Sequence, residues 1–132
     1  MYAHAYQQYR QTQVETAGPG QLILMLYNGG IRFCKQAQGA LEKGQLEVAH
    51  RALVRAQQIV DELMAALDLE AGEVAHNLMR LYEYMNQRLL EANLKKDQET
   101  LGEVKAMFTE LRDAWQAMLK SGQAASPRRV VL

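Results

Sequence analysis

The sequence predicts an all-α protein that folds as an antiparallel up-down four-helix bundle. Residues that favour helices, chiefly Ala, Leu, Met, Gln, Glu and Lys, dominate the 132-residue chain. The 2 prolines, Pro19 and Pro127, lie near the ends, so no proline interrupts the middle of the chain. The alternation of apolar and polar residues that is typical of strands is missing from the sequence.

The first predicted helix begins at Pro19, because the fixed φ of proline suits the first position of a helix. It extends to about Lys43, and Gly44 is expected to cap its end. Two adjacent glycines, Gly29 and Gly30, lie inside this helix, where glycine is unfavourable. They indicate either the close approach of a neighbouring helix or a kink.

Three further helices are predicted, over Leu46 to Leu67, over Glu73 to Lys95, and from Asp97, as N-cap, to just before Gly122. In the second and fourth helices the apolar residues recur at i, i+3, i+4 and i+7, which gives each helix one apolar side. The short connections favour antiparallel neighbours. At 1.5 Å per residue the bundle would be about 35 Å long.

The chain is divided by the sequence into three parts. Residues 1–18 hold Tyr6 and Tyr9 at a spacing that puts both on one side of a helix, and we expect this part to dock on the bundle, as a short helix or extended. Residues 19–121 form the bundle domain. Residues 122–132 are small and polar except for the last three, and are expected to be a flexible tail.

The charge balance and the hydropathy exclude several classes of protein. Lys plus Arg is 15 and Asp plus Glu is 15, which argues against nucleic acid as a partner. The longest unbroken apolar run, Leu22 to Tyr27, is far short of a membrane span, and the first residues do not form a signal peptide. Cys34 is the only cysteine and cannot form an internal disulfide. We therefore expect a cytoplasmic protein without membrane insertion.

Two Glu-x-x-His motifs, Glu47/His50 and Glu73/His76, match the spacing of a di-iron site in a helical bundle. Helical geometry places all four side chains away from the apolar sides of their helices, whereas the ligands of such a site project into the core. Cys34 lies on an apolar stripe and is expected to be a buried structural thiol. The sequence therefore predicts a protein that binds no metal or cofactor and is not an enzyme. A metalloprotein that uses the two Glu-x-x-His motifs is the alternative.

The third helix carries more apolar surface than one core stripe requires. The expected core stripe is Val74, Leu78, Leu81, Met85, Leu89 and Ala92. A second, offset set widens the apolar arc to about 220°; it is Met79, Tyr82, Leu90 and Leu94. In the first predicted helix Tyr27 can face the core, whereas Leu24 and Met25 cannot lie on that same side.

This surplus has more than one explanation. A helix wedged between two others buries a wide arc, and the N-terminal segment could cover the rest. The surplus could also form a groove for the amphipathic helix of a partner, and the 7 methionines suit an adaptable binding surface. The first two explanations are compatible with one another. A self-associating bundle, in which the surplus is a homodimer interface, is a further alternative.

Several blocks of the sequence resemble the FliS family of flagellar secretion chaperones. They are "YQQY" at 6–9, "TAGPGQLILMLYNGGIRF" at 16–33, "AQQIVDEL" at 56–63, "LYEYMNQRLLEANLKKD" at 81–97 and "LRDAWQ" at 111–116. The resemblance covers about residues 2–118. Gly18, where the family often has Ser or Thr, and Cys34 are less typical, and neither falls within the two central motifs, "PGQLILMLYNG" and "YEYMNQRLLEAN".

The resemblance implies a cytoplasmic, ATP-independent export chaperone that binds the disordered C-terminal segment of flagellin and prevents premature polymerisation. It also implies delivery to the flagellar type III export apparatus, with export-gate components as further partners. The N-terminal segment would occupy part of the client site until it is displaced. The client-binding residues that we predict are Tyr6, Tyr9, Leu24, Met25, Tyr27, Met79, Tyr82, Asn86, Leu90, Asn93 and Leu94. Asn86 and Asn93 would offer hydrogen bonds to a docked backbone.

Overall fold

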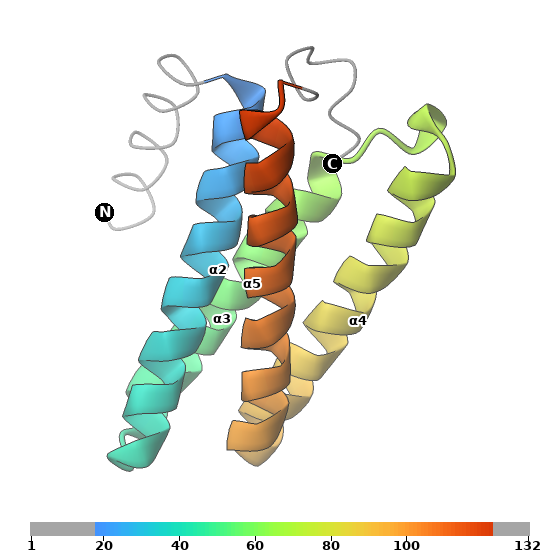
Figure 1. Cartoon of the computed structure of the whole chain (residues 1–132). Helices are drawn as coiled ribbons and strands as arrows, with labels where there is room; N and C mark the ends of the chain where they lie inside the picture. The colour runs from blue at the N-terminus through green and yellow to red at the C-terminus, as the bar shows by residue number, and fades with distance from the viewer. Residues whose placement is uncertain (1–17, 123–132) are drawn as a thin grey trace, which may run out of the picture.

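The computed structural model describes residues 18–122, which form four long helices and one short 3-10 turn (Figure 1). The helices are α2 (Pro19–Glu42), α3 (Leu46–Ala65), α4 (Glu73–Lys95) and α5 (Gln98–Lys120). Consecutive helices run in opposite directions, and α2 lies against α3 and α5 while α4 lies against the same two helices. The predicted antiparallel four-helix bundle is thereby confirmed.

The helix ends agree closely with the sequence prediction. Helix α2 begins at Pro19, and Gly44 follows its end with φ +71°, the left-handed conformation expected of a capping glycine. Asp97 caps α5, since its carboxylate accepts a hydrogen bond of 3.0 Å from the backbone N–H of Glu99. The connections between the helices lie at the two ends of the bundle (Figure 1). The unpaired backbone N–H and C=O groups at the helix ends are therefore kept out of the core.

The connection between α3 and α4 differs from the prediction. Helix α3 ends at Ala65, two residues earlier than expected, and η1 (Leu69–Ala71) follows as a separate 3-10 turn. Asp68 caps this turn by accepting a hydrogen bond of 3.0 Å from the backbone N–H of Glu70. Gly72 then has φ +125°, a value that side chains disfavour, and this glycine turns the chain into α4.

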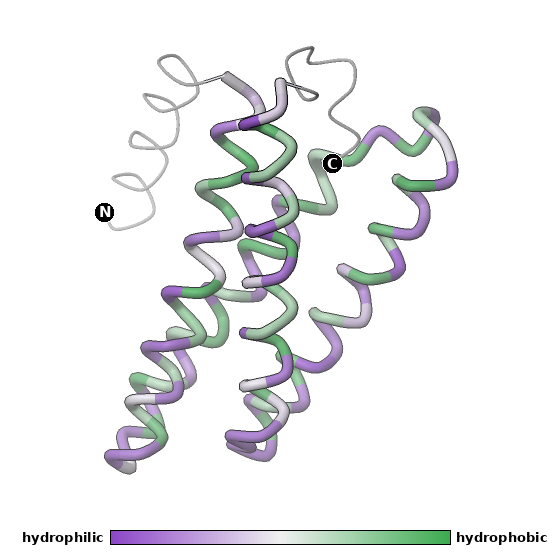
Figure 2. The backbone as a smooth tube through the Cα atoms, in the orientation of Figure 1, coloured by the Kyte–Doolittle hydropathy of each residue, from purple (hydrophilic) through white to green (hydrophobic). Residues whose placement is uncertain are grey.

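Each helix is polar on its outer side and apolar on its inner side (Figure 2). The inner sides of α2, α3 and α5 are buried along most of their length. Helix α4 contributes to the core mainly from Tyr82 onward, through Tyr82, Met85, Leu89 and Ala92. In its first turns only Ala75 is buried. Figure 1 shows the corresponding arrangement: the first turns of α4 lie apart from α5, and the last turns lie beside it.

The two glycines inside α2 are explained by close packing and not by a kink. A Cβ atom on Gly30 would lie 2.5 Å from the ring of Phe108 in α5, and one on Gly29 would lie 3.2 Å from Cδ1 of Ile59 in α3. Helix α2 continues without interruption through both positions. Glycine therefore lets the backbone of α2 approach both neighbours.

Candidate functional site

The structure buries two of the residues that we predicted to contact a client. Tyr27 and Tyr82 have exposed fractions of 1% and 0%, and their hydroxyl oxygens are hydrogen-bonded at 2.7 Å. The assignment of Tyr82 to the surplus set is wrong, because its side chain belongs to the core and its hydroxyl is hydrogen-bonded to Tyr27 of α2. Both tyrosines hold helices together inside the bundle and are not part of a surface.

Asn93 is also corrected. Its side chain is 8% exposed, and its amide is hydrogen-bonded at 2.9 Å to Nδ1 of His50 in α3. Its carbonyl oxygen accepts a further hydrogen bond from Nζ of Lys96. The amide is therefore engaged within the bundle and is not available to a docked backbone.

Asn86 is half-buried and hydrogen-bonded to Asp61 of α3. The other seven predicted residues fall into three groups. Tyr6 and Tyr9 lie outside the residues that the structure describes. Leu24, Met25 and Met79 are half-buried. The two leucines of the surplus set, Leu90 and Leu94, are 49% and 77% exposed, as expected of residues outside the core stripe. These exposed leucines are unusual because they follow one another on the same side of one helix.

A row of hydrogen bonds fixes how α3 and α4 lie beside the exposed leucines. His50 is bonded to Asn93 near one end, and Asn86 donates a hydrogen bond of 2.7 Å to Asp61 nearer the other. The two helices are antiparallel, so a step forward along α3 corresponds to a step back along α4. Val54 follows His50 by one turn and Leu90 precedes Asn93 by one turn, so Val54 and Leu90 lie at the same level of the bundle. Val54 is half-buried.

These residues define the surface that we call the α3–α4 outer face. It consists of Leu46, Val54, Met79, Leu90 and Leu94, bordered by His50, Asp61, Asn86 and Asn93. Leu46 is 54% exposed at the start of α3, which lies at the end of the bundle where α4 ends. The Oδ1 atom of Asn86 is buried and has no hydrogen-bond partner among the described residues. The face is thus apolar with a polar border, which is the usual composition of a binding surface.

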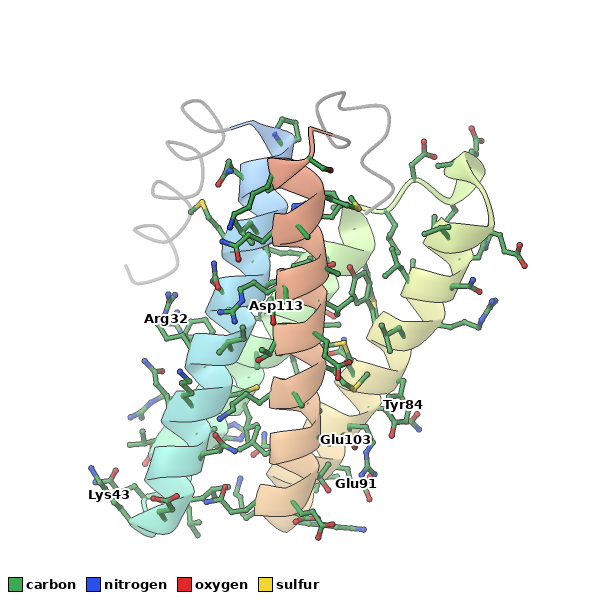
Figure 3. The ribbon with its side chains drawn as sticks, in the orientation of Figure 1. Arg32, Lys43, Tyr84, Glu91, Glu103 and Asp113 are labelled. Atoms are coloured by element: carbon green, nitrogen blue, oxygen red, sulfur yellow. The ribbon has the colours of Figure 1, made fainter. Side chains whose placement is uncertain are left out.

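The opposite edge of α4 is closed by polar contacts with α5. Tyr84 donates a hydrogen bond of 2.8 Å to Glu103, and Nε of Arg88 binds the same carboxylate at 2.8 Å (Figure 3). The hydrogen bond from Arg88, followed by that from Tyr84, lowers the pKa of Glu103 below its usual value. Glu91 continues the network with Arg88 and Lys95, and its pKa is lowered chiefly by the hydrogen bond from Lys95. This edge is therefore an ion-paired contact between helices.

The residues of the two Glu-x-x-His motifs do not come together. Glu47 and His50 lie at the start of α3, Glu73 and His76 lie at the start of the antiparallel helix α4, and all four are exposed. Glu47 pairs with Arg51 at 3.2 Å. Over residues 18–122, no three His, Cys, Asp or Glu side chains are grouped so that they could hold a metal ion.

Cys34 is completely buried, and this burial raises the pKa of its thiol to about 12. A thiol with so high a pKa carries almost no thiolate at neutral pH and is a poor nucleophile. Among the described helices, none is both long and apolar enough to cross a membrane.

Sequence reasoning missed a second apolar surface, where the first half of α4 faces the second half of α5. Val74, placed in the core stripe by the periodicity, is 59% exposed. On the same side of the two helices, by helix position, are Leu78 and Leu81 of α4 and Leu111 and Met118 of α5, which are half-buried and pack against the core. We call these five residues the α4–α5 seam. The periodicity of the apolar residues indicates which side of α4 faces the bundle. It carries no information on how far α5 lies from that side.

Comparisons with known proteins place this chain among helical-bundle proteins of the flagellar export system. A solved structure described as "Crystal structure of flagellar chaperone from bacteria" has the same fold, with a TM-score of 0.73 at 17% identity over 92% of this chain and 99% of that chain. The family model described as "Flagellar protein FliS" matches residues 2–122.

Curated relatives agree with the family model. The flagellar secretion chaperone FliS of Bacillus subtilis is 40% identical over 116 residues, which are 88% of this chain and 86% of the relative. The FliS chaperone of Salmonella typhimurium is 40% identical over 114 residues, 82% of this chain and 84% of the relative. FliSB of Pseudomonas aeruginosa is 41% identical over 124 residues, 89% of this chain and 98% of the relative. This chain belongs to the FliS family of flagellar secretion chaperones, and its role is that of a chaperone in flagellar export.

Proposed function

We infer that this protein binds the disordered C-terminal segment of flagellin on the α3–α4 outer face, keeps it from polymerising, and delivers it to the flagellar type III export apparatus. The observation that supports this most directly is the pair of exposed leucines, Leu90 and Leu94, one turn apart on α4. An amphipathic helix of the client presents apolar side chains at positions i, i+3, i+4 and i+7. This spacing suits contact with a row of leucines along a helix of the chaperone.

The energetics favour a surface of this kind for a client that folds as it binds. Ordering a disordered segment costs conformational entropy, and burial of apolar side chains offsets that cost. Full burial of one leucine contributes about 1.5–3 kcal/mol. Neither ATP nor a cofactor is needed, because reversible burial is enough to keep the client from associating with itself. The binding takes place in the cytoplasm, before export.

Calorimetric titration with a peptide of the flagellin C-terminal segment tests this proposal. Leu90→Asp and Leu94→Asp should each weaken binding at least tenfold, because a charge then replaces an apolar contact, while the helical content stays unchanged. Val48→Asp is the matched control, since Val48 is a 40% exposed aliphatic residue of α3 outside the outer face. Equal losses in all three variants, or no binding of the wild-type protein at micromolar concentration, would refute the proposal.

A homodimer could use the same exposed leucines. Sedimentation velocity of the protein alone separates the two possibilities. We expect a monomer without peptide and a 1:1 complex with peptide. A dimer that Leu94→Asp dissociates, together with the absence of peptide binding, would assign the outer face to self-association.

The N-terminal segment, residues 1–18 with Tyr6 and Tyr9, stays a prediction because all of it except Gly18 lies outside the described residues. We expect it to cover apolar surface in the absence of client and to be displaced on binding. Deletion of residues 1–15 should then increase the fluorescence of a dye that binds apolar surfaces. An unchanged signal would argue against docking of this segment. Contact between the complex and export-gate components is likewise a proposal, which pull-down with and without flagellin peptide tests.

A further inference from the structure

The α4–α5 seam is an apolar surface that the described part of the chain leaves partly uncovered. Toward the end of α4, the contacts of Tyr84 and Arg88 with Glu103 hold α4 against α5. Toward its start α4 diverges from α5 (Figure 1). Val74 is more than half exposed although the apolar periodicity places it on the core stripe of α4. Val74 therefore offers apolar surface that the described residues leave open to a further contact.

The residues around the start of α4, at one end of this seam, are acidic. Between Arg55 and Arg80 the sequence has no Lys or Arg, and it has five acidic residues there, Asp61, Glu62, Asp68, Glu70 and Glu73. Asp68, Glu70 and Glu73 are exposed at or next to the start of α4. Over residues 18–122 these three carboxylates form no ion pair, whereas Glu47, Glu91, Glu103 and Asp113 each do. A segment that covers the seam should therefore be basic beside an apolar run.

The sequence contains such a segment at its C-terminal end. Arg128 and Arg129 are followed directly by Val130, Val131 and Leu132. Helix α5 ends at Lys120, at the same end of the bundle as the start of α4 (Figure 1). The residues after Gly122 could span about 30 Å if extended, at roughly 3.3 Å per residue, so the segment could reach the seam. Its place in the same chain also gives it a millimolar effective concentration.

We propose that residues 128–132 dock in cis on the α4–α5 seam. Arg128 and Arg129 pair with the carboxylates of Glu70 and Glu73, and the three apolar residues cover Val74 and Leu78. Exposed ion pairs are individually weak, so the arginines chiefly set the position while the apolar side chains supply most of the contact. This inference does not depend on flagellin binding, since the α3–α4 outer face lies on another side of α4.

Disulfide trapping in the full-length chain tests the proposal. Val74→Cys combined with Val131→Cys should form an intramolecular disulfide under mild oxidation, and Cys34 does not interfere because it is fully buried. Arg128→Glu with Arg129→Glu should slow this reaction at least tenfold, because attraction becomes repulsion. Adding Glu70→Arg and Glu73→Arg should restore the rate. Leu94→Cys with Val131→Cys is the control at the far end of α4 and should react slowly.

Two results would overturn the proposal. If the reversal of the two charges left the rate of disulfide formation unchanged, the segment would be reaching position 74 by random diffusion of the chain and not by docking. Cross-linked dimers in place of monomers would assign the seam to a second copy. A nitroxide on Val131→Cys gives an independent readout that leaves the seam intact: it should broaden the amide signals of residues 69–78, and Arg128→Glu with Arg129→Glu should abolish the broadening. Absence of broadening in the protein with both arginines would also refute the proposal.

Discussion

The hydroxyl groups of Tyr27 and Tyr82 meet at 2.7 Å in the middle of the bundle, where α2 and α4 would otherwise present only apolar side chains to each other. Burying a hydroxyl without a partner is costly, and here each hydroxyl is the partner of the other. The pair therefore connects two helices that are not neighbours along the chain.

A double-mutant cycle on this pair should show strong coupling. Tyr27→Phe and Tyr82→Phe should each lower the free energy of unfolding by about 1–3 kcal/mol, because each leaves one buried hydroxyl unpaired. The double variant should lose less than the sum of the two, since both polar groups are then gone. Urea unfolding followed by circular dichroism measures all four proteins. Additive losses would show that the two hydroxyls do not depend on each other.

The same pair predicts a loss of stability at alkaline pH. Burial raises the pKa of Tyr27 from 10.0 to about 12, and burial, followed by the charge of Tyr27, raises the pKa of Tyr82 further. Between pH 10 and 12 the unfolded chain releases these protons while the folded protein keeps them, so the free energy of unfolding falls as pH rises. Each tyrosine contributes about 1.4 kcal/mol per pH unit to this fall.

The control for this pH dependence is the Tyr27→Phe/Tyr82→Phe double variant. Cys34, whose pKa burial also raises to about 12, titrates in the same direction and is present in both proteins. The difference between the two stability curves therefore isolates the tyrosines. Wild type should lose about 2.7 kcal/mol per pH unit more than the variant above pH 10. Parallel curves measured by urea unfolding from pH 8 to 11.5 would contradict the assigned burial.

The sequence alone allowed the helices to be predicted more accurately than their contacts. Pro19, Gly44 and Asp97 act locally, on the backbone within one turn, so they place helix ends without knowledge of the neighbours. The turn Leu69–Ala71 was missed because a single 3-10 turn has no periodicity to detect.

The errors on α4 have one physical origin. Periodicity gives the direction of a side chain about its own helix axis, and it predicted correctly that Leu90 and Leu94 point away from the core. It gives neither the distance nor the tilt of the next helix. Tyr82 is therefore buried, with its hydroxyl bonded to Tyr27 of α2, on a side that was predicted to be surplus, and Val74 is exposed on a side that was predicted to be core.

The close approach of α2 and α5 makes Gly30 intolerant of a side chain. In Gly30→Ala the new Cβ would lie 2.5 Å from Cε1 and Cζ of Phe108, a ring that is completely buried and cannot move aside. We expect the free energy of unfolding to fall by about 1–3 kcal/mol or more. Thermal unfolding measures the change.

Gly39→Ala is the matched control, in the same helix and without any atom within 4 Å of the new Cβ. Alanine has the higher helix propensity, so this variant should gain up to about 1 kcal/mol. Opposite signs at the two positions would separate the close approach from helix propensity. A stabilised Gly30→Ala would show that α2 and α5 lie farther apart than in the structure.

Trp115 connects the end of α5 to the start of α2. Its indole Nε1–H donates a hydrogen bond of 2.7 Å to the backbone carbonyl of Gly20, in the first turn of α2, and its ring is buried. Trp115→Phe removes this donor and part of the ring, and should cost about 1–3 kcal/mol. Because the lost contact is at one end of the bundle, amide hydrogen exchange should accelerate over residues 22–26 and change little over residues 82–89. A uniform acceleration along all four helices would mean that Trp115 stabilises the whole bundle and does not specifically hold the start of α2.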